Sequence, residues 1–145
     1  MPAIEMLTLA NHAEAVNGLL YLSGAGWDRV TRRFPRGQQP RAHHFGIAVS
    51  VIVPWTEANR KHHLSLWIEP EDGGPALIKA DGEFEVGRPA GVPSGSDRRA
   101  VIAVDAVVEF PKAGGYRLVG ETGGNRRTYS FFVVDQLVPV AEDGE

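Results

Sequence analysis

Residues 43–70 read HHFGIAVSVIVPWTEANRKHHLSLWIEP, and the spacing of the apolar side chains in this stretch decides the fold class. Every second residue from Phe45 to Trp55 is apolar, which is the period of a β-strand with one face on a core. Residues 64–68 resume the same alternation after the segment TEAN. The pattern predicts that both segments are neighbours in one antiparallel hairpin, with residues 56–59 as its loop.

Turn signals separate similar segments along the rest of the chain. Asn17-Gly18 is typical of a tight hairpin turn, since both residues adopt positive φ at low cost. The glycines and prolines of residues 87–97 predict an irregular connection that carries the chain from one sheet to the other. About eight or nine strands at this spacing indicate an all-β protein built as a two-sheet sandwich.

The C-terminal part of the chain adds a more specific feature. Tyr116 starts a strand directly after the segment FPKAGG, and this placement resembles the tyrosine corner of Greek-key sandwiches. A turn at Gly123-Gly124 would pair Tyr116 with Phe131 on the core face. We therefore expect an immunoglobulin-like, Greek-key antiparallel β-sandwich.

Two passages carry a resemblance to a known family. They are LANHAEAVNGLLYLSGAGWDRV (residues 9–30) and VPWTEANRKHHLSLWIEPEDGG (residues 53–74), followed by the Pro-Gly-Tyr hairpin. The chain resembles an uncharacterised family of small bacterial proteins of the actinobacterial type, a domain of unknown function. The resemblance implies an immunoglobulin-like β-sandwich and supplies no catalytic residue, because its motifs are turn and core positions.

Length and composition bound the function further. The 145 residues fit a single domain, residues 1–145, with an acidic and flexible tail expected at residues 139–145. The absence of cysteine excludes disulfides, thiolate metal sites and cysteine nucleophiles. No stretch approaches the roughly 20 apolar residues of a membrane span, and the first residues lack a signal-peptide pattern. We expect a cytoplasmic bacterial protein without membrane contact.

The net charge of −3 hides a basic segment. Residues 29–61 carry six arginines and one lysine against the single carboxylate of Glu57. The segment RRFPRGQQPR, residues 32–41, is expected to be an exposed loop. Its arginines could bind phosphates, or they could be solvated and pair with acidic strands. The candidate anion-binding residues are Arg29, Arg32, Arg33, Arg36 and Arg41.

A second candidate surface lies on the outward face of the expected hairpin. Trp67 and His63 would point away from the core, on the same side as Ile52. Such a face is either covered by the chain's own N-terminal strands or the 87–97 connection, or it is a subunit or partner interface. Three residues near the hairpin tip would contribute to that interface, namely Trp55, Glu57 and Asn59.

Signals for catalysis are weak. The chain has no Gly-x-Ser-x-Gly elbow and no dinucleotide-binding glycine pattern. In the expected hairpin, the pair His43-His44 lies about 30 Å from the pair His62-His63, so the two pairs do not share a metal ion. A local metal site at Glu57 and His62 is the remaining alternative. We expect no cofactor.

These observations favour a non-catalytic interaction or assembly module with an unidentified partner. The alternative is a module that binds nucleic acid or another polyanion through the segment Arg29–Arg41, although the acidic protein and the lack of a recognition helix argue against nucleic acid. The third reading is a metal-dependent enzyme around Glu57 and His62. The sequence does not set the oligomeric state.

Overall fold

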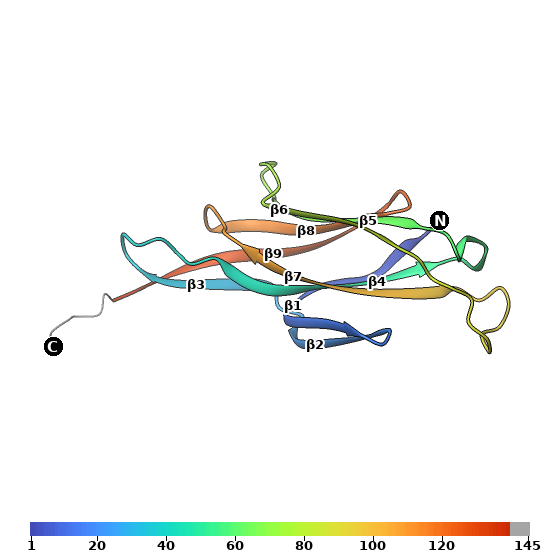
Figure 1. Cartoon of the computed structure of the whole chain (residues 1–145). Coiled ribbons are helices and arrows are strands. Elements are labelled where there is room, and N and C mark those ends of the chain that lie inside the picture. The colour runs from blue at the N-terminus through green and yellow to red at the C-terminus, as the bar shows by residue number, and fades with distance from the viewer. Residues whose placement is uncertain (140–145) are drawn as a thin grey trace.

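The computed structural model describes residues 1–139 and stacks two β-sheets face to face (Figure 1). One sheet has the strand order β2-β1-β4-β7, and the other has the order β3-β9-β8-β5-β6. The expected two-sheet β-sandwich is confirmed, and the chain crosses between its sheets after β2, β3, β4, β6 and β7. The strands are β1 (Ala3–Val16), β2 (Leu19–Ala25), β3 (Arg29–Pro35), β4 (His43–Val53), β5 (His62–Pro70), β6 (Ile78–Phe84), β7 (Arg98–Val108), β8 (Gly114–Thr122) and β9 (Asn125–Val138). The flexible tail was expected at residues 139–145, and all of it except residue 139 lies outside the described residues.

The expected pairing of residues 45–53 with residues 64–68 is wrong. β4 pairs with β1 and β7, whereas β5 pairs with β6 and β8 in the opposite sheet. Pro54 and the 3₁₀ turn Trp55–Glu57 make the connection an arch that crosses from one sheet to the other. A hairpin and an arch place the same alternate residues on the core, so periodicity does not distinguish them.

The inner faces of the two sheets form the core. Phe45 and Phe131 are fully buried there, together with Tyr116, whose ring lies 4.9 Å from that of Phe110. The Tyr116 hydroxyl donates to the carbonyl of Lys112 at 2.6 Å, which is the tyrosine corner expected from the sequence. Tyr116 also pairs with Phe131 across the Gly123-Gly124 turn, so that expected register is confirmed.

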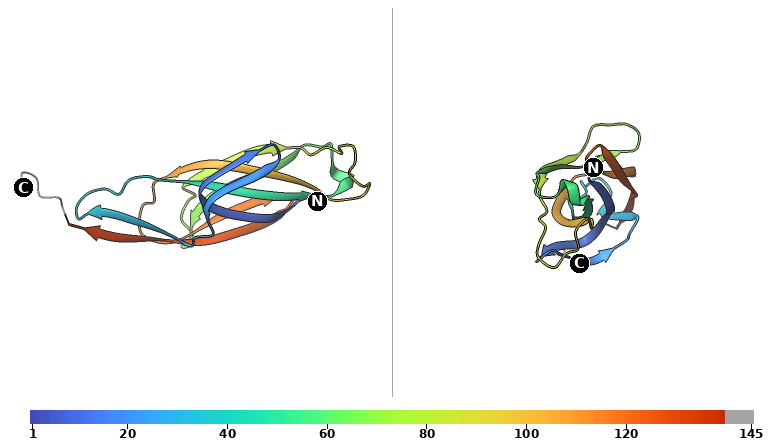
Figure 2. Two further views of the ribbon diagram at one scale, coloured as in Figure 1. Left: turned by 90° about the horizontal axis from the view of Figure 1, so that it is seen from below. Right: turned by 90° about the vertical axis from the view of Figure 1, so that its right-hand side faces the viewer.

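β1 pairs with β4 up to Ala10, and beyond this residue the β1–β2 hairpin folds over the outer face of β4 (Figure 2). Its turn at Asn17-Gly18 has the expected positive φ at both residues. The hairpin crosses β4 at Gly46, where an added Cβ would lie 2.7 Å from the backbone nitrogen of Ala13. β1 and β2 also contact β7, although β4 separates them from β7 in the sheet. The chain itself therefore covers much of β4's outer face, where Ala48 and Ser50 are buried.

The first part of the expected 32–41 loop is a strand. β3 includes residues 32–35 and lies at the edge of the second sheet, parallel to β9, although all pairings were expected to be antiparallel. Sequence patterns missed this strand because an inward position, Arg32, is an arginine instead of an apolar residue. The segment 87–97 does carry the chain between the sheets, as expected. Nothing helical in the described residues has the length and apolar character that a bilayer crossing requires.

Candidate functional site

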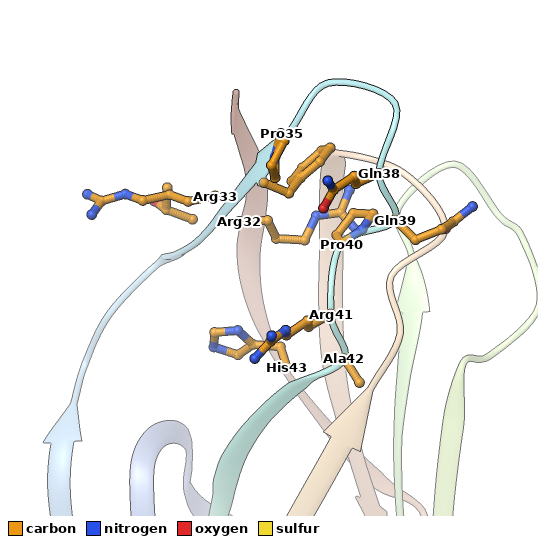
Figure 3. A pocket seen from close by; sticks show the side chains of 11 residues that line it. Arg32, Arg33, Pro35, Gln38, Gln39, Pro40, Arg41, Ala42 and His43 are labelled. Atoms are coloured by element: carbon orange, nitrogen blue, oxygen red, sulfur yellow. The ribbon is translucent and has the colours of Figure 1, made fainter. Parts of the chain in front are cut away.

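Three arginines and a histidine line a hollow where β3 turns back into β4 (Figure 3). The connecting segment 36–42 is shaped by a turn in which the Gln38 N–H donates to the Pro35 carbonyl at 3.1 Å. Gly37 in this turn has a φ of 82°, which a side chain would disfavour. The segment and the two strand ends enclose an open cavity of about 420 Å³, lined by Thr31, Arg32, Arg33, Phe34, Pro35, Gln38, Gln39, Pro40, Arg41, Ala42 and His43.

A second cavity, of about 390 Å³, adjoins the first. Both cavities share the side chains of Arg32 and Arg41, together with Gln39 and Pro40. The second one continues along the segment after β7, where Glu109 contributes a carboxylate. We call the two together the basic cavity; Arg32 and Arg41 stand where its two halves meet.

Arg32 is the fixed group of the basic cavity. Its side chain comes from an inward position of β3, and the residue is only 7% exposed. The guanidinium donates Nε to Asp135 Oδ1 at 2.6 Å and Nη2 to Asp135 Oδ2 at 3.0 Å, and Nη1 donates to the Phe110 carbonyl at 2.7 Å. These bonds use three of its five N–H groups, and within residues 1–139 the other two have no hydrogen-bond partner.

Arg41 and His43 also line the cavity, and neither is held by an ion pair within residues 1–139. Arg41 is exposed, and within residues 1–139 no carboxylate forms an ion pair with it. His43 begins β4 and packs its ring against Phe45 at 5.9 Å. Burial lowers the pKa of His43, and the neighbouring His44 lowers it further, which favours the neutral ring. A bound anion would favour protonation of this ring.

The structure divides the five arginines singled out in the sequence. Arg32, Arg33 and Arg41 line the cavity, whereas Arg29 and Arg36 do not. Arg33 points away from the loop in Figure 3, and its Nε donates to Gln136 at 3.0 Å. Arg32 is a buried ion-pair partner instead of an exposed loop residue. The arginines therefore do not form one continuous basic stripe.

Sequence reasoning missed two contributors to the site, Asp135 and His43. Asp135 is the one carboxylate in the apolar strand segment SFFVVD. The alternation of this strand assigns its position to the core side, so a charged residue there was a signal that the sequence offered. His43 joins the site only through the fold of the loop that precedes it. No local pattern connects Asp135 with Arg32, because β3 and β9 are about a hundred positions apart in the chain.

The expected partner face is not one surface. Ile52 belongs to β4 and Trp67 to β5, so they lie in different sheets. Trp67 does point outward, and the cations of Arg126 and Lys79 lie 5.2 Å and 5.8 Å from its ring. Its indole N–H donates to Glu69 at 2.6 Å. Long charged side chains thus cover this tryptophan, together with the polar partner it needs.

The other residues predicted for that face, namely His63, Trp55 and Asn59, lie in different local environments. His63 is exposed beside Asp81, on the same outer face as Trp67. Trp55 lies in the arch, with the Arg88 guanidinium 4.8 Å from its ring. Asn59 has a φ of 61° and donates its backbone N–H to the Val86 carbonyl at 2.7 Å. These contacts hold the arch to residues 86–88 at the start of the connection to β7.

The His62 ring contacts the backbone of Glu57, whereas the Glu57 carboxylate has another partner. The His62 Nε2 atom lies 2.8 Å from the Glu57 carbonyl oxygen, and the Glu57 carboxylate pairs with the terminal amino group at 2.7 Å. This contact with the amino group lowers the pKa of Glu57. In the part of the chain that is described, no three His, Asp or Glu side chains are grouped as metal ligands. His43 and His62 stand at opposite ends of the sandwich because β4 and the arch separate them.

Comparison with known proteins adds one result to this geometry. No curated protein matches the chain. A model of a family of unknown function, DUF6941, matches residues 5–134, which cover seven of the nine strands in full and most of β1 and β9 at the two ends. The chain therefore belongs to this family of unknown function, DUF6941.

Proposed function

We propose that this protein is a non-catalytic interaction module that recognises an anionic group of its partner, a phosphate or a carboxylate, in the basic cavity. The observation that carries the proposal is the pairing of a buried, oriented arginine with a free one. Arg32 is held by Asp135 and the Phe110 carbonyl, while Arg41 forms no ion pair within residues 1–139 and shares its half of the cavity with the Glu109 carboxylate.

The cavity favours a discrete anion over a long polyanion. Arg29 starts β3, about 20 Å from the loop at roughly 3.3 Å per residue, and does not line the cavity. Arg36 lies on the loop outside it. A nucleic-acid strand needs a continuous line of cations, and the net charge of −3 disfavours one. Polyanion binding through Arg29–Arg41 stays the second candidate.

The test measures thermal unfolding with inorganic phosphate or citrate added to an anion-poor buffer. A ligand at 100 times its dissociation constant adds about 2.7 kcal/mol to stability, which raises Tm by about 5–10 °C for a chain of this size. Arg41→Gln should remove most of this shift. Arg29→Gln removes the same charge from the far end of β3 and should leave the shift intact.

The two candidates differ in their response to salt and to these variants. A polyanion site would bind a single-stranded oligonucleotide at low ionic strength, lose it steeply as salt rises, and be weakened equally by both variants. Equal effects of Arg29→Gln and Arg41→Gln, or no shift with either anion, would contradict the discrete site.

The proposal also places the protein in a bacterial cytoplasm. The lack of cysteine and the twelve arginines against three lysines support this setting.

A further inference from the structure

β7 is a long edge strand. It pairs with β4 along its whole length, and within residues 1–139 no strand lies on its other side. Edge strands normally are short, carry charged side chains or prolines, or contain bulges, and these features prevent pairing with another chain. β2, β3 and β6 have seven residues each, β3 ends at Pro35, and β6 contains Lys79 and Asp81. β7 has eleven residues without a proline, a lysine or a bulge, and its charges are those of Arg98, Arg99 and Asp105. Among the described edge strands, β7 thus offers the longest edge to another strand.

The inner side of β7 is also incompletely covered. Ile102 and Val104 point into the sandwich but are only half-buried. They line an open apolar groove of about 160 Å³ between β7 and the edge strand of the facing sheet, together with Leu64, Leu66, Ala80, Asp81, Gly82, Glu83 and Phe84. A strand added beside β7 would remove apolar surface from water here.

We propose that β7 pairs antiparallel with β7 of a second copy of this chain, centred on Ile102. Directly opposite residues of an antiparallel pair point to the same face, so Ile102 would meet Ile102 of the second copy and Ala100 would meet Val104 on the inner side. The contact is a two-fold one, in which the same patch serves both copies. It would join the two four-stranded sheets into one.

The charges of β7 support a second copy as the occupant. Arg99 and Asp105 lie three residues on either side of Ile102 and both point outward. In the proposed register each Arg99 is opposite Asp105 of the second copy, and the pair occurs twice. Both side chains are exposed, at 59% and 66%. Arg99 uses Nε and Nη2 on Glu5, which leaves Nη1 for this contact.

Sedimentation equilibrium of the intact protein tests this proposal independently of the anion site. The wild type should form dimers at protein concentrations up to about 100 μM, which would populate a complex of micromolar affinity. Arg99→Asp and Asp105→Arg each place like charges opposite one another twice, so each variant should weaken the dimer at least about tenfold.

Mixing the two variants is the decisive step. In a mixed dimer, the new aspartate at position 99 of one copy faces the new arginine at position 105 of the other, and the native Asp105 of the first copy faces the native Arg99 of the second. The mixture should therefore regain the wild-type dissociation constant, as should the double variant R99D/D105R. Lys61→Glu reverses an exposed charge before β5 and should have no effect.

Three results would each overturn the proposal: a monomeric wild type, a dimer that neither charge reversal weakens, or a mixture as weak as the single variants. Far-ultraviolet circular dichroism checks that every variant is folded.

Discussion

Replacing Asp135 by asparagine should destabilise the protein more than replacing its partner Arg32 by methionine. The two side chains form one bidentate ion pair, but they differ in their access to water. The Arg32 side chain is 6% exposed and the Asp135 side chain is 31% exposed. After Arg32→Met, the carboxylate can turn toward solvent. After Asp135→Asn, the guanidinium keeps its charge in a buried position without a counter-ion.

The structure sets the size of each effect. Removing one partner of a buried ion pair costs about 3–5 kcal/mol when the other charge stays buried. The partial exposure of Asp135 places Asp135→Asn at the lower end, about 3 kcal/mol, because water already screens the pair. Arg32→Met also leaves the Phe110 carbonyl without its donor, and it should cost about 1–2 kcal/mol. A loss of about 3 kcal/mol corresponds to a Tm lower by about 6–12 °C.

Urea unfolding followed by tryptophan fluorescence measures both variants and the Arg32→Met/Asp135→Asn double variant. The double variant should be less destabilised than the sum of the single ones, since it contains no unpaired buried charge. Phosphate should stabilise Asp135→Asn more than the wild type, because the anion replaces the missing carboxylate beside Arg32. A cost for Asp135→Asn below that for Arg32→Met would refute the assignment of Arg32 as the buried, fixed member of the site.

Two further predictions concern the outer hairpin and the cavity histidine. Gly46→Ala would place a Cβ 2.7 Å from the Ala13 nitrogen, so it should displace the β1–β2 hairpin and cost about 1–3 kcal/mol in urea unfolding. Gly82→Ala, whose Cβ meets nothing within 4 Å, is the matched control, and equal losses would speak against hairpin packing on β4. Burial lowers the pKa of His43 below its unfolded value of 6.5, so its contribution to stability is present above pH 6.5 and is lost as the pH falls toward the folded pKa. The free energy of unfolding should therefore fall more between pH 7.5 and about 5.5 in the wild type than in His43→Gln; parallel curves would argue that His43 is not desolvated.

The alternation of apolar residues by itself determined that this chain forms two packed β-layers. Period-two segments such as Phe45–Val53 have one face that must leave water, and this requirement holds wherever the strand is placed. Local turn chemistry also settled the two tight hairpins, because Asn17-Gly18 and Gly123-Gly124 adopt positive φ without strain. The tyrosine corner at Tyr116 followed from its position after the FPKAGG segment.

Only the tertiary structure decided which strands are neighbours and where the functional groups meet. β4 and β5 carry the alternation of a hairpin, yet Pro54 and the following 3₁₀ turn direct them into opposite sheets. The basic cavity depends on Arg32 meeting Asp135 across the parallel pair β3–β9, a contact between residues far apart in the chain. Periodicity reports which face of a strand is buried, but a long-range pairing depends on the summed packing of both sheets, and no local pattern encodes that sum.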